Sequence, residues 1–195
     1  MNWRLPLLLA CSLLLVGCNT LSPSLKQTKK AALIGPELPQ HWVLAGRIGV
    51  LKGGEGWHGK MDWRQDKTDF TIRILGPFGG EQAELRHRND KLELRGSNGK
   101  SVSGPRLAAW ERDTFGTSLP VNALPYWLHG HPFPGEQASP QRDAKGQLKE
   151  LRQLGWRVIY SDWGQRGGRP MPGKLSLERN QVRIKLIINE YNRRG

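Results

Sequence analysis

Apolar side chains recur at every second position through most of this chain, and that period is typical of β-strands. The period is clearest over residues 42–50, where Trp42, Leu44, Ile48 and Val50 fall on one face. It recurs over residues 182–188, where Val182, Ile184, Leu186 and Ile188 do so. The chain also contains 24 glycines and 13 prolines, which disfavour long helices and supply turns. The sequence therefore predicts about ten antiparallel strands, joined by short turns such as Asn89–Asp90 and residues 97–99.

The middle of the chain departs from this alternation. Helical spacing of apolar residues predicts a helix over 105–115, ended by Gly116. A second short helix is expected over 120–128, with Asn122 as its N-cap, followed by a long loop over 129–147. The expected fold class is therefore mainly β with a helical insertion.

The predicted sheet occupies one domain, residues 41–195, and has one apolar face. Such a face must curl on itself or pack against the helices, and a strongly curled sheet can enclose a small apolar ligand. Seven of the eight tryptophans lie in this domain, and side chains of that size either fill a core or line a cavity. Composition does not distinguish these two arrangements.

The N-terminal residues indicate a secretory leader. Arg4 provides a basic start, and residues 5–16 form an apolar run of signal-peptide length that ends Leu-Val-Gly-Cys at Cys18. This ending resembles the bacterial lipobox. The resemblance implies cleavage between Gly17 and Cys18, an S-diacylglyceryl group on Cys18 and an N-acyl chain such as palmitate. Residues 1–17 are thus expected to be a lipoprotein signal peptide; the alternative is a short apolar helix with an incidental cysteine.

Residues 18–40 are polar and irregular, with three prolines and three lysines, and we expect a lipidated N-terminus followed by a flexible tether. A flexible chain of this length spans roughly 25–30 Å. Asn19, rather than an aspartate, follows the lipidated cysteine. By the sorting rule of similar lipoproteins, this implies transfer to the outer membrane, with the domain on its periplasmic face.

The net charge of +13 predicts an anionic partner, such as anionic lipid or an acidic protein. A periplasmic location argues against nucleic acid. The two cysteines, Cys11 and Cys18, both lie at the N-terminus, so the domain is expected to have neither a disulfide framework nor a cysteine metal cluster.

Several short stretches of the domain carry a family resemblance. They are WVLAGRIGV at 42–50, WHGKMDW at 57–63, FTIRILGPFG at 70–79, LPV at 119–121, YWLHG at 126–130, QLGW at 153–156 and RIKLII at 183–188. In this order, and joined to the lipobox, they resemble the LolB family. Members of that family are outer-membrane lipoproteins that receive other lipoproteins and place them in the membrane.

The resemblance implies an unclosed antiparallel β-barrel of about ten or eleven strands, with helices covering one opening and an internal apolar cavity. It also implies the periplasmic carrier LolA as donor, acylated lipoproteins as cargo, and the inner leaflet of the outer membrane as their destination. The protein itself is expected to be a monomer without a cofactor beyond the lipid on Cys18. The candidate cavity-lining residues are Trp42, Leu44, Ile48, Phe70, Ile72, Ile74, Trp127, Trp156, Val158, Ile184 and Leu186.

Residues 75–80 join two predicted strands, and Phe78 lies between Pro77 and Gly79 at the tip of the turn. At the matching position the family carries a protruding apolar residue, commonly Leu, that helps to deliver cargo into the membrane. The resemblance gives that role to Phe78. The alternative is a tight turn whose Phe78 ring folds back onto the sheet.

Enzyme function is not expected. His129 and His131 offer two metal ligands without a partner cluster, so we expect no metal site. The paired carboxylates Glu81 and Glu84 lie among basic residues and are expected to be solvated charges rather than a hydrolase pair. A second non-enzymatic class stays open: a structural outer-membrane lipoprotein whose filled barrel binds an anionic envelope partner.

Overall fold

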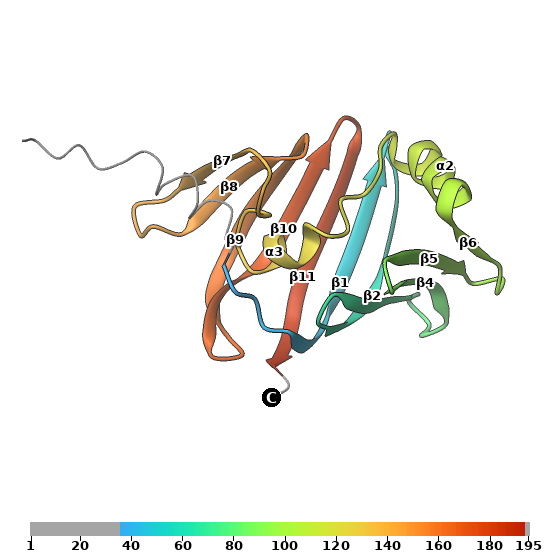
Figure 1. Ribbon diagram of the computed structural model, residues 1–195, viewed down its shortest axis with the longest axis horizontal. Coiled ribbons are helices and arrows are strands. Elements are labelled where there is room, and N and C mark those ends of the chain that lie inside the picture. The colour runs from blue at the N-terminus through green and yellow to red at the C-terminus, as the bar shows by residue number, and fades with distance from the viewer. Residues whose placement is uncertain (1–35, 194–195) are drawn as a thin grey trace, which may run out of the picture.

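The computed structural model describes residues 36–193, and the expected signal peptide, Cys18 and most of the tether lie outside the described residues. Eleven antiparallel strands form one strongly curved sheet (Figure 1). The strands are β1 (His41–Lys52), β2 (Glu55–Asp66), β3 (Asp69–Leu75), β4 (Glu81–Arg88), β5 (Lys91–Gly96), β6 (Ser101–Ser103), β7 (Ala138–Arg142), β8 (Leu148–Gln153), β9 (Trp156–Arg166), β10 (Arg169–Arg179) and β11 (Val182–Arg193).

The strand order is β6-β5-β4-β3-β2-β1-β11-β10-β9-β8-β7, so the first and last strands meet at the centre of the sheet. In the described part of the chain, the edge strands β6 and β7 do not pair with each other, and the barrel is unclosed. The predicted mainly-β fold with a helical insertion is therefore confirmed. Most neighbours are joined by tight turns, among them Asn89–Asp90, where both residues have positive φ as a two-residue hairpin turn requires.

Two helices lie over the concave side of the sheet. Helix α2 (Gly104–Phe115) matches the prediction, and Gly116 ends it in a left-handed conformation with φ 68°. Helix α3 (Leu124–Leu128) is shorter than expected, and its N-cap is Ala123 rather than Asn122. The predicted cap is wrong because the backbone folds into a turn first, in which the Ala123 amide donates to the carbonyl of Pro120.

The long loop expected over residues 129–147 is also interrupted by a strand. Strand β7 lies at the edge of the sheet and pairs only with β8. Its residues Ala138–Arg142 are mostly exposed and include no large apolar side chain, and Pro140 is tolerated because an edge strand leaves one side unpaired. The strand therefore lacks the apolar alternation by which the others were predicted. No helix among residues 36–193 is long and apolar enough to span a bilayer.

One half of the concave face is a packed core built around α3. Trp127 is fully buried, and its indole N–H donates to the Gln153 side-chain oxygen at 2.9 Å. Trp42 packs against Trp63, with ring centroids 5.1 Å apart, and meets the ring of His129 edge-on at 5.5 Å. Trp42 and Trp127 are thus buried in a packed core, while Trp63 lies at its border with the rest of the concave face.

His129 joins α3 to the centre of the sheet. Its Nδ1 lies 2.7 Å from the Pro125 carbonyl oxygen and therefore donates to it, which leaves Nε2 to accept from the Tyr191 hydroxyl at 2.9 Å. Burial lowers the pKa of His129 to about 4, and the hydrogen bond to Pro125 offsets only part of that effect. The imidazole is therefore neutral at pH 7, and both of its nitrogens are occupied by protein partners.

This histidine should make the stability of the protein depend on pH. Below pH 6.5 the unfolded chain protonates His129 while the folded protein does not, so the free energy of unfolding falls as pH falls toward 4. The difference in pKa corresponds to about 3 kcal/mol. Urea titrations at pH 7 and pH 4 should show that His129→Gln loses less stability on acidification than the wild type, by about that amount. Equal losses in the two proteins would contradict the account.

Candidate functional site: an apolar cavity

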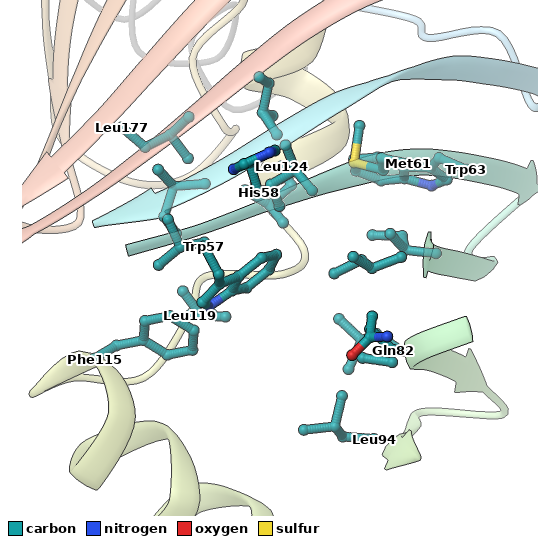
Figure 2. A pocket seen from close by; sticks show the side chains of 18 of the residues that line it. Trp57, His58, Met61, Trp63, Gln82, Leu94, Phe115, Leu119, Leu124 and Leu177 are labelled. Carbon is teal, nitrogen blue, oxygen red and sulfur yellow. The ribbon is translucent and has the colours of Figure 1, made fainter. Parts of the chain in front are cut away.

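The other half of the concave face encloses a cavity of about 710 Å³ (Figure 2). This volume lies within the roughly 300–1,000 Å³ typical of small-ligand sites. Side chains from β1 to β5 and from β9 to β11 form its floor, and α2 with residues 116–124 forms its cover. Figure 2 shows Trp57, Met61 and Leu94 pointing into the space from the sheet, with Phe115 and Leu119 facing them from the cover.

The structure divides the predicted lining residues into two groups. Six of them line the cavity: Ile48, Ile72, Ile74, Trp156, Ile184 and Leu186. Five do not and are buried in the packed half instead: Trp42, Leu44, Phe70, Trp127 and Val158. Both groups lie on the concave face, as the alternation predicted. What separates them is their position along the strands, because α3 covers one half of that face.

Sequence reasoning missed part of the lining. Met61, Trp63 and Leu94 lie on the same face as the predicted residues, and the alternation of β2 and β5 could have identified them. The contribution of the cover was missed as well. In α2, the buried side chains occur at positions i, i+4 and i+8, which is the signal of a helix packed against one surface.

Helix α2 bridges the cavity from one side of the curved sheet to the other. Its N-terminal end continues directly from β6 and contacts β5. Near its other end, the Lys52 ammonium at the tip of β1 donates to the backbone carbonyl of Asp113. The ring of Trp110 meets that of Phe115 edge-on at 5.5 Å. The helix thus contacts β5 and β6 on one side of the cavity and the end of β1 on the other.

Exposed apolar side chains gather at the end of the sheet where the cavity opens. Within residues 36–193, the large apolar side chains that are exposed are Leu51, Trp57, Phe78 and Trp110, with relative exposures of 42%, 46%, 102% and 37%. Trp57 and Trp110 also line the cavity, as does Pro77 beside Phe78. We call the four exposed residues Leu51, Trp57, Phe78 and Trp110 the apolar rim.

Phe78 is fully exposed at the tip of the β3–β4 turn. The turn is closed by two backbone hydrogen bonds, from Gly76 to the carbonyl of Gly80 at 2.8 Å and from Gly79 to that of Gly76 at 3.0 Å. Gly79 adopts φ 86°, a conformation that a glycine takes without strain. The alternative in which the Phe78 ring folds back onto the sheet is therefore wrong.

The chain enters the domain at the end of the sheet opposite to the apolar rim. Strand β1 begins at His41 beside the packed half and reaches the rim at Leu51. Ten residues of extended strand separate these positions by about 33 Å. The backbone therefore enters β1 far from the cavity opening.

Glu81 and Glu84, the candidate hydrolase pair of the sequence, lie on the convex face, away from the cavity. Glu84 is buried, which corrects the expectation of a solvated charge, and Arg73 donates to it at 3.0 Å while Arg86 donates to its other oxygen. Burial would raise the pKa of Glu84, but the hydrogen bond from Arg73 and the nearby arginine charges outweigh it and lower the pKa. Glu81 pairs with Arg95 at 2.9 Å. These groups join β3, β4 and β5 on the outer surface.

One carboxylate does belong to the cavity. Glu111 on α2 lines it and is 7% exposed. Burial raises the pKa of Glu111, while the backbone N–H of Leu119 and the charge of Arg112 lower it by less. Nothing in the sequence singled out this residue beyond its place in the buried stripe of α2. As for metals, no group of three potential ligands occurs within residues 36–193.

A curved, unclosed antiparallel sheet with an apolar cavity under a helix defines a class of proteins that can hold an apolar ligand on the concave face. A solved structure with the same fold is that of a LolA-superfamily protein from Nitrosomonas europaea, with a TM-score of 0.50 over 87% of this chain and 93% of that one. At 9% identity this likeness shows the fold alone.

Sequence comparison identifies the family. The model of the family described as "Outer membrane lipoprotein LolB" matches residues 40–191. The outer-membrane lipoprotein LolB of Nitrosococcus oceani is 33% identical, with 98% of each chain covered. That of Chromohalobacter salexigens is 30% identical over 91% of this chain and 85% of its own. The chain belongs to the LolB family, so it is a non-enzymatic outer-membrane lipoprotein, as expected.

The volume of the cavity can be tested with a probe. Ala83 lines the cavity from β4, beside Ile74. Ala83→Phe should place a ring in the empty space, weakening binding of a fluorescent fatty acid at least about ten-fold without lowering the melting temperature. Lys60→Phe, on the exposed convex side of β2, is the matched control and should bind normally. Equal affinities for the two variants would show that the probe binds elsewhere.

Proposed function

We propose that the protein accepts triacylated lipoproteins in its apolar cavity and inserts them into the inner leaflet of the outer membrane. The observation that carries this proposal is the cavity itself, about 710 Å³ of mostly apolar space that opens at an apolar rim. The alternative of a structural lipoprotein with a filled barrel is disfavoured, because α3 fills only one half of the concave face.

The physical need for such a protein follows from the cargo. Three acyl chains of about sixteen carbons expose roughly 45 methylenes, which at about 0.8 kcal/mol each cost on the order of 35 kcal/mol in water. A carrier must shield the chains across the periplasm, and we propose LolA as that donor. Transfer then proceeds downhill, from carrier to this cavity and from the cavity to the bilayer, without a nucleotide. A monomer suffices for both steps.

We further propose that Cys18 carries the lipid anchor and that residues 18–40 act as a tether. The anchor would hold the chain at the membrane, while the apolar rim lies about 33 Å from His41, at the far end of β1. A flexible segment of 23 residues, spanning roughly 25–30 Å, allows the domain to turn its rim toward the bilayer. The positive charge of the chain supports approach to an acidic carrier or to anionic headgroups.

The loop at Pro77, Phe78 and Gly79 is proposed to deliver the cargo. The Phe78 side chain is the most exposed large apolar group among residues 36–193, and Pro77 beside it lines the cavity. A ring in this position can enter the leaflet while the acyl chains leave along the same side of the opening. Trp57 and Trp110 are suited to the interface, where tryptophan is favoured.

Phe78→Glu should separate acceptance of cargo from its release. The variant keeps the cavity, so it should fold and take lipoprotein from the carrier. A carboxylate at the bilayer must be desolvated at a cost of several kcal/mol, so deposition into liposomes should fall at least about ten-fold. Phe78→Leu is the matched control and should deposit cargo nearly normally. Scoring transfer and incorporation separately provides the test, and full deposition by Phe78→Glu would refute the role of the loop.

Cys18→Ala should abolish acylation. Without the thiol there is no thioether, so radiolabelled palmitate should not enter the protein, and the domain should either stay soluble or retain its leader. Cys11→Ala, in the part of the leader that is removed, is the control and should label normally. Incorporation of palmitate into the Cys18→Ala protein would show that the lipidation site lies elsewhere.

A further inference from the structure

Glu111 is a buried polar group in the wall of the cavity, whose other polar side chains, Gln82 and His58, are exposed. Among the described residues that line it, Glu111 is the one ionisable side chain that is buried; His58, the other ionisable residue of the lining, is exposed. Burying a carboxyl group is unfavourable unless it is hydrogen-bonded. In a mostly apolar wall, the Glu111 carboxyl group therefore needs a hydrogen-bond donor.

The surroundings of Glu111 satisfy the carboxyl group only in part. The Leu119 backbone N–H faces it, and Arg112 follows it on the exposed side of α2. Lys52, at the tip of β1, donates to the backbone carbonyl of Asp113. A carboxyl group offers two oxygens with several acceptor positions, so one N–H donor leaves most of this capacity unused.

The position of Glu111 along the cavity is equally informative. It directly follows Trp110 of the apolar rim, and it lies two residues before Asp113, whose carbonyl binds the tip of β1. Glu111 is therefore just inside the opening, whereas Met61 and Trp63 line the cavity toward the packed half of the sheet. A ligand with apolar chains inside and a peptide outside would place its linkage beside Glu111.

We propose that Glu111 accepts a hydrogen bond from the amide N–H of the acylated cysteine of the cargo. This inference rests on the proposed function. The linkage of a triacylated cysteine contains two esters and one amide, and the amide is its N–H donor. Inside an apolar opening that donor is costly to bury without an acceptor. Glu111 supplies one in either protonation state, and so fixes how deeply the chains enter.

The test compares two ligands on the same proteins. The first is a tripalmitoyl-cysteinyl lipopeptide, and the second is its analogue with that amide N-methylated, which removes the donor. Affinities are measured by displacement of diphenylhexatriene, a hydrocarbon probe that makes no hydrogen bond. Glu111→Leu removes the acceptor, Glu111→Gln retains an amide oxygen, and Asp113→Leu changes an exposed carboxylate on the same helix as a control.

We expect Glu111→Leu to bind the lipopeptide roughly ten-fold more weakly than the wild type, while both bind diphenylhexatriene equally. Glu111→Gln should restore most of the affinity, and Asp113→Leu should not change it. The wild type should discriminate against the N-methylated ligand, and Glu111→Leu should not. The comparison of ligands on the unmodified protein remains decisive if Glu111→Leu lowers the melting temperature.

The possible failures are distinguishable. A wild type that binds diphenylhexatriene but not the lipopeptide would refute the proposed function, and the inference with it. Equal affinities of the wild type for the two lipopeptides would refute the inference alone and leave the cavity as a purely apolar site. In that case Glu111 would serve only to hold Leu119 and residues 116–124 against α2.

Discussion

The packing of α3 against one half of the concave face is the interaction on which the rest of the structure depends. Trp127 is held by Gln153, and His129 is held by Pro125 and Tyr191, so the short helix is fixed at the centre of the sheet. Because this half is filled, it forms a packed core that stabilises the sheet even though the sheet does not close into a barrel. The other half can then remain open without loss of the fold.

This division gives each end of the molecule its own chemistry. At the packed end, the indole N–H of Trp127 and both ring nitrogens of His129 have protein partners, and strand β1 begins there at His41. At the open end, the apolar rim faces solvent, which is unfavourable for a protein that acts alone in water. Both features are consistent with a domain held from one end that presents its other end to a bilayer.

The strands and the apolar face could be predicted from the sequence because each rests on a local period. The division of that face could not, because it depends on where α3 lies, and Trp42 and Ile48 belong to one strand with one alternation. Strand β7 was not predicted because this edge strand has no buried apolar face. Asn122 was predicted to be the N-cap of α3, but the backbone turn makes Ala123 the N-cap instead. Whether the Phe78 ring points into solvent or folds back onto the sheet depends on the geometry of the turn from Gly76 to Gly80, which the residue types alone do not specify. The sequence did not identify Glu111 as a cavity residue because a carboxylate on a helix is usually solvated.

The central claim is that the half-open cavity holds the acyl chains of the cargo. The most direct measurement is a crystal structure of the protein with a bound triacylated lipopeptide. The account predicts density for the chains between Met61 and Ile74 on the sheet and Phe115 on α2, with the packed half around Trp127 unchanged. Chains lying on the convex face, or outside the apolar rim with the cavity empty, would contradict it.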